Sequence, residues 1–247
     1  MSIHAQGGAQ LATSVLLIAA LLGWGMAYVV NRLADELIGM GRSARPVILA
    51  CWQHRKHDVR WELRPWLIEL GMPLLFAWTA FRFEVTAQAV VIAGYLSVLL
   101  LISAVDWATR RIPNVVVLPA SAAAVLSAAA GVPPGLWRSL SGGALAFGVF
   151  FLAYLLGGLF LRAMGPRAAG GGPALGLGDV KLAMFIGLVT GYPNVMIALL
   201  VGTLAGAIAA LGQIVWTFIR RRRYQPFTAM AYGPYLALGA AVALLWG

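Results

Sequence analysis

Long apolar stretches alternate with short polar segments along the whole chain. Eight stretches are dense in Leu, Ala, Val, Ile and Gly and contain no Lys or Arg: residues 11–31, 65–81, 87–105, 114–130, 139–161, 182–191, 193–219 and 229–246. A helix needs about 20 such residues to cross a hydrocarbon core of ~30 Å. The pattern therefore predicts an all-α polytopic membrane protein with about eight transmembrane helices. The sixth stretch is short, and Pro193 beside it either kinks one long helix or marks a tight turn.

The composition narrows the class of protein further. Of 247 residues, 61% are hydrophobic and 11% are charged, and the mean hydropathy is +0.85. Soluble domains carry roughly a quarter charged residues, so these values exclude a soluble enzyme, a disordered protein and a disulfide-stapled secreted domain. The single cysteine, Cys51, also excludes a Cys-rich zinc ribbon.

The basic residues predict the topology. If eight spans alternate, only Arg82 and Arg138 of the 18 Lys and Arg residues fall on one side of the membrane. The positive-inside rule makes the other side the cytoplasm, which places both termini outside it. The net charge of +10 is then a topology signal, and we expect no nucleic-acid partner. Arg220 to Arg223 follow a span and are expected to rest on anionic lipids of the bilayer.

Two of the eight carboxylate residues differ from the others in their position along the chain. Asp106 and Asp179 each lie at the predicted cytoplasmic edge of a span. Each has an ordinary explanation, since Asp179 suits a helix N-cap and Asp106 suits an ion pair with Arg110. Brought together, however, two carboxyl groups share a proton because both cannot ionise cheaply. One charged and one neutral carboxyl would equip a site for water-activating peptide hydrolysis.

The segments around these residues resemble a known family. Residues 106–114, DWATRRIPN, resemble the D-x-x-T-x-x-I-P-N segment of type IV prepilin leader peptidases, and residues 176–182, GLGDVKL, match their GxGD-x-K-L segment. Residues 232–237, YGPYLA, look like the family's aromatic-Gly-Pro element. Residues 23–33 and 65–76 resemble the end of its first span and a divergent start of its second.

The resemblance implies an aspartic peptidase of the bacterial inner membrane. It would remove the short basic leader from prepilins or pseudopilins of type IV pili or type II secretion. Residues 1–31 would form the first transmembrane helix, 32–64 a basic cytoplasmic loop and 65–247 the membrane-embedded peptidase domain. The peptidase would need no cofactor. Asp106 and Asp179 would be the catalytic pair, with support from Gly176, Gly178, Lys181, Thr109 and Pro113.

The loop of residues 32–64 departs from the family pattern. Many members carry two Cys pairs there and also N-methylate the new N-terminus with S-adenosylmethionine, whereas this loop has Cys51 alone. S-adenosylmethionine is therefore expected only if methylation is retained. Cys51, His54 and His57 have a spacing that could supply three zinc ligands, but the spacing is unusually tight. A lone cysteine with surface histidines in a basic loop is the simpler explanation, and we predict no metal site.

Two other classes of function remain open at this point. Membrane-edge acids and broken helices also suit a proton-coupled transporter, and a non-catalytic scaffold derived from a peptidase would keep the same motifs. The sequence does not assign the catalytic base between the two aspartates, the particular prepilin or the oligomeric state.

Overall fold

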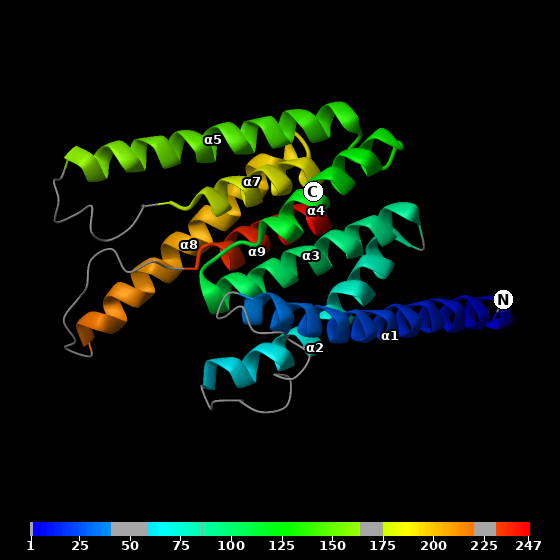
Figure 1. Ribbon diagram of the computed structural model, residues 1–247. Helices are drawn as coiled ribbons and strands as arrows, with labels where there is room; N and C mark the ends of the chain where they lie inside the picture. The colour runs from blue at the N-terminus through cyan, green and yellow to red at the C-terminus, as the bar shows by residue number, and fades with distance from the viewer. Residues whose placement is uncertain (1, 41–58, 85, 164–174, 220–230) are drawn as a thin grey trace. The chain divides into compact units, whose positions relative to one another are not determined.

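The computed structural model describes residues 2–40, 59–84, 86–163, 175–219 and 231–247 (Figure 1). All regular structure in these ranges is helical, which confirms the all-α prediction. Each predicted apolar stretch overlaps one helix. The helices are α1 (Ser2–Met40), α2 (Val59–Phe83), α3 (Ala87–Thr109), α4 (Asn114–Ala129), α5 (Leu136–Ala163), α7 (Leu177–Thr190), α8 (Asn194–Ile219) and α9 (Gly233–Trp246).

Four of these helices are long and apolar enough to cross a membrane. The qualifying segments are Thr13–Gly39, Ala87–Thr109, Leu136–Phe160 and Asn194–Trp216. Asn114–Ala129 and Gly233–Trp246 are apolar but shorter. The long apolar helices support the membrane class, and the count of eight spans stays a prediction.

The interruption at residues 191–193 is a turn between two helices. Thr190 ends α7 and Asn194 begins α8. Gly191 has φ +67°, a left-handed conformation that glycine adopts without steric cost. The N–H of Tyr192 donates to the carbonyl oxygen of Arg138 on α5 at 2.9 Å, which ties this turn to the start of that helix. Of the two interpretations of Pro193, the tight turn is correct.

The chain divides into two compact units, Met1–Ala104 and Val105–Gly247. In the first unit, α1 packs against α2. A β-carbon built on Gly23 of α1 would lie 2.8 Å from the carbonyl oxygen of Met72 on α2. The two backbones therefore approach more closely at this point than any larger residue would allow.

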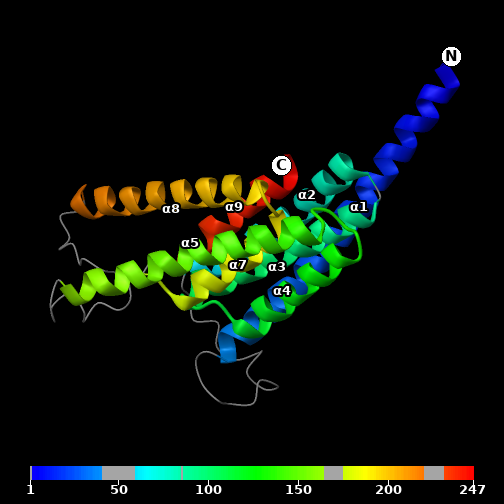
Figure 2. The same ribbon diagram turned by 90° about the horizontal axis from the view of Figure 1, so that it is seen from above.

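The second unit is held together by a similar use of glycine. In it α5 packs against α7, and α8 packs against α9 (Figures 1 and 2). A β-carbon on Gly142 of α5 would lie 2.5 Å from the carbonyl oxygen of Gly187 on α7. Next to this contact, the Ser139 hydroxyl donates to the carbonyl oxygen of Leu188 at 2.7 Å. Small residues thus let α7 lie close against α5, as in other membrane helix pairs.

We expect Gly142→Ala to destabilise this unit by about 1–3 kcal/mol, because the added methyl group meets backbone atoms that cannot rotate away. The matched control is Gly148→Ala on the same helix, where nothing lies within 4 Å of the added β-carbon. Thermal unfolding in detergent measures both variants. If both variants had the same thermal unfolding midpoint, the close contact between Gly142 and Gly187 would not limit the stability of this unit.

Candidate active site

Asp106 lies one turn before the end of α3 and is 3% exposed. Its Oδ2 accepts a hydrogen bond of 2.9 Å from the backbone N–H of Gly233, the first residue of α9. A buried carboxylate requires such a donor, because losing water without compensation costs several kcal/mol. A β-carbon on residue 233 would lie only 2.8 Å from Oδ2. Glycine at this position therefore allows the carboxylate to reach the start of α9.

Asp179 lies in the first turn of α7, which begins at Leu177. Gly176 is the N-cap residue, and its N–H donates to Asp179 Oδ2 at 3.1 Å. Asp179 is therefore the third residue of the helix rather than the N-cap, which corrects the ordinary explanation considered for it. A carboxylate at this position satisfies a free backbone donor and lies at the positive end of the helix dipole.

The surroundings of Asp179 favour its protonated form. Asp179 comes before the apolar stretch 182–191 in the sequence and therefore lies outside that predicted span. Burial raises the pKa of its carboxyl from 3.8 to about 6; the hydrogen bond from Gly176 opposes this rise, and the negative charge of Asp106 adds to it. The two carboxyl groups are therefore electrostatically linked, as expected of acids that share a proton.

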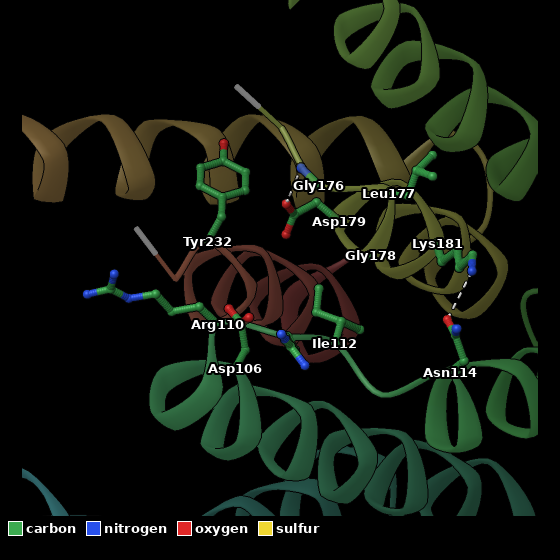
Figure 3. Close-up of a pocket in the computed structure, with 11 residues that line it drawn as sticks. Asp106, Arg110, Ile112, Asn114, Gly176, Leu177, Gly178, Asp179, Lys181 and Tyr232 are labelled. Atoms are coloured by element: carbon green, nitrogen blue, oxygen red, sulfur yellow. Dashed lines mark hydrogen bonds between the residues drawn. The ribbon is translucent and has the colours of Figure 1, made fainter. Parts of the chain in front are cut away.

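Both carboxylates line one pocket of about 350 Å³ (Figure 3). Figure 3 shows Asp106 and Asp179 approaching this pocket from different helices, with Tyr232 beside them. Of the residues predicted to support the site, Gly176, Gly178 and Lys181 line the pocket, whereas Thr109 and Pro113 are not part of its lining. The lining comprises Asp106, Arg110, Arg111, Ile112, Asn114, Gly176, Leu177, Gly178, Asp179, Lys181 and Tyr232.

A sharp turn joins α3 to α4 at the edge of this pocket. The Thr109 hydroxyl donates to the carbonyl oxygen of Val105 at 2.8 Å, within the last turn of α3. Arg110 follows with φ +54°, a conformation that is uncommon outside glycine and is often found at functional sites. Pro113 is the extended N-cap of α4. In the part of the chain that the structure describes, no ion pair joins Asp106 to Arg110, so that ordinary explanation is not supported.

The sequence did not assign roles to Tyr232, Gly233 or Asn114. The Tyr232 ring lies against Phe150 of α5, with ring centroids 6.5 Å apart, and against Gly206 of α8. All three residues lie in the segments that resemble the family motifs, so the sequence already marked them as candidates for the site. Their partners lie on other helices, and a motif does not reveal such contacts.

The weak metal candidates Cys51, His54 and His57 lie outside the described residues. Within the described ranges, no group of three or more His, Cys, Asp or Glu side chains is placed to hold a metal ion.

A model of the type IV leader peptidase family matches residues 93–211, which include both aspartates. No solved structure matches the chain.

Named bacterial proteins extend the match beyond that segment. The chain is 30% identical over 185 residues to a prepilin leader peptidase/N-methyltransferase of Pseudomonas aeruginosa, covering 73% of this chain and 58% of the relative. It is 28% identical over 181 residues to the protein of the same name in Pseudomonas putida, with the same coverage. A namesake in Burkholderia pseudomallei is 30% identical over 187 residues, which is 73% of this chain and 54% of that relative. The chain thus spans little more than half the length of these leader peptidase relatives.

We expect the stability gained by Asp179→Asn to depend on pH. The raised pKa means that wild-type stability is complete below about pH 4 and falls as the pH rises through about 6, because the folded state resists ionisation. Asparagine cannot ionise and still accepts the Gly176 hydrogen bond. The free energy of unfolding of the variant should exceed that of the wild type by about 2–3 kcal/mol at pH 7.5 and should equal it at pH 4, and thermal unfolding at both pH values measures the difference. A gain that persists unchanged at pH 4 would contradict this explanation.

We expect Gly233→Ala to lower the stability by about 1–3 kcal/mol, since the added β-carbon displaces the buried Asp106 carboxylate from its donor. The cost should shrink when Asp106 is first replaced by alanine, because the displaced group is then absent. A double-mutant cycle of thermal midpoints measures this coupling. Purely additive effects would show that Gly233 acts independently of Asp106.

Proposed function

We propose that this leader peptidase homologue is a membrane aspartic endopeptidase that removes the short basic leader of type IV prepilins or pseudopilins on the cytoplasmic face. The observation that carries the proposal is the pairing of Asp106 and Asp179 at one pocket. One oxygen of each carboxylate accepts a backbone N–H. In the proposed reaction, the other oxygen of each carboxylate acts on a water molecule and a peptide bond.

The proposed chemistry uses one carboxylate and one carboxylic acid. The ionised group takes a proton from water as the water oxygen attacks the scissile carbonyl carbon, and the neutral group gives its proton to the carbonyl oxygen. The C–N bond then breaks as the leaving amine receives a proton from the pair, and one hydroxyl group of the tetrahedral intermediate returns its proton to the other carboxylate. With a pKa of about 6, Asp179 is protonated in roughly a tenth of molecules at pH 7. The pair titrates as a unit, so the base is not assigned to one residue.

We place this site at the cytoplasmic edge of the bacterial inner membrane, in a chain of eight spans with both termini outside the cytoplasm. Arg110, Arg111 and Lys181 line the same pocket as the two aspartates. Under the positive-inside rule these cations mark the cytoplasmic end of their helices. In this arrangement residues 65–247 form the peptidase domain, 32–64 the basic loop, and Arg220 to Arg223 contact anionic lipids.

The names of the relatives also include an N-methyltransferase activity. We propose methylation by this chain only as a second step that uses S-adenosylmethionine on the newly exposed N-terminus. The names of the relatives support this step, whereas the loop of residues 32–64 has Cys51 alone. Mass spectrometry of the mature N-terminus detects the added methyl group.

We expect Asp106→Asn and Asp179→Asn each to abolish leader removal, because a missing proton acceptor or donor in such a reaction costs about 100- to 10,000-fold in rate. Co-expression with a prepilin, followed by an immunoblot of the leader, measures cleavage, and membrane fractions show whether each variant accumulates. Glu84→Gln is the matched control, since Glu84 is an acid outside the pocket lining.

Full cleavage by either asparagine variant would exclude the aspartate pair. If the wild-type chain itself leaves the prepilin intact, the proton-coupled transporter or the non-catalytic scaffold becomes the better explanation.

A further inference from the structure

Lys181 makes a long-range hydrogen bond beside the aspartates. Its ammonium donates to Oδ1 of Asn114 at 3.0 Å. The bond joins the second turn of α7 to the first residue of α4, which are 67 positions apart in the sequence. Both side chains line the pocket, and Figure 3 shows the bond at one end of it. Lys181 therefore contacts the turn that follows the Asp106 helix.

A second contact fixes the same turn. The Ile112 side chain lies against Gly178, where an added β-carbon would be 3.1 Å from Ile112 Cβ. Gly178 and Lys181 flank Asp179 along α7, while Ile112 and Asn114 follow Asp106 and the end of α3. The turn is thus attached to α7 on both sides of Asp179. Any movement of this turn changes the position of Asp106 relative to Asp179.

Lys181 can act on the two aspartates in two ways. Its positive charge can change their pKa values, or its hydrogen bond can fix their positions. Its hydrogen-bond partner is a neutral amide rather than a carboxylate. The shift in the pKa of Asp179 arises from burial, Gly176 and Asp106, and Lys181 is not among its causes. The geometry therefore favours position over charge.

We propose that Lys181 and Asn114 are a pair of positioning residues whose hydrogen bond sets the placement of the two aspartates relative to each other. The proposal rests on the peptidase activity proposed above. Loss of either partner leaves both carboxylates present but free to shift. A displacement of about 1 Å can cost about 100-fold in rate, whereas substrate binding elsewhere on the protein is unaffected.

The test is a double-mutant cycle on the whole 247-residue chain in detergent, with a prepilin leader peptide as the substrate. We expect Lys181→Met and Asn114→Leu each to lower kcat by about 10- to 100-fold with KM changed less than about threefold. The double variant should be no slower than the slower single variant, because both changes break one bond. Asn114→Asp keeps an acceptor for the Lys181 ammonium and should therefore recover part of the kcat that Asn114→Leu loses. Arg138→Met, which removes a cation outside the pocket lining, is the matched control.

Other results would overturn the proposal. Additive losses in the double variant would show that the two residues act independently. A shifted pH profile for Lys181→Met would show that its charge matters, and unchanged kcat in both single variants would show that the bond is dispensable. If Lys181→Met fails to accumulate, Asn114→Ala carries the same test without removing a charge. A wild-type protein that does not cleave overturns the peptidase proposal together with this one, whereas cleavage with additive variants overturns this one alone.

Discussion

The hydrogen bond between the Asp106 carboxylate and the Gly233 N–H is the constraint on which the site depends. Asp106 is buried, and a buried carboxylate without a donor would be expelled or permanently neutralised. The donor comes from the start of α9, so the end of α3 and the start of α9 must lie together. This requirement explains why glycine occupies position 233. The Gly-Pro element is thus part of the carboxylate site, although it contributes no titratable group of its own.

Small residues make the rest of the arrangement possible. The close approach of Gly142 and Gly187 lets α7 lie against α5, and the approach of Gly239 to Ala198 and Gly202 does the same for α9 and α8. Helices with larger side chains at these positions would be held further apart. The two helices whose first turns carry Asp179 and Gly233 are therefore held against α5 and α8 by backbone contacts. Such contacts are stiff, and a stiff frame suits a reaction that needs two carboxyl groups at a fixed separation.

The helical architecture was largely predictable, whereas the contacts of the site were not. Hydropathy located every described helix because apolar side chains must be removed from water. It misplaced some ends, such as those of α1, which runs over Ser2–Met40 rather than 11–31, since a helix continues through polar residues when its backbone bonds are satisfied. The motifs identified Asp106 and Asp179. The Gly233 donor and the Asn114 partner of Lys181 join positions 127 and 67 residues apart, and only the packing of helices brings such positions together.

The lengths of α7 and α9 have a consequence for the surrounding bilayer. Each helix has 14 residues and is therefore about 21 Å long, roughly 9 Å less than a typical hydrocarbon core. Most residues of both helices are buried, so other helices rather than lipid surround them. In the eight-span arrangement proposed above, these short helices leave part of the membrane thickness for water to fill at the end where the pocket lies. An extended peptide, whose backbone groups would go unpaired in lipid, would then have an aqueous route to the two aspartates.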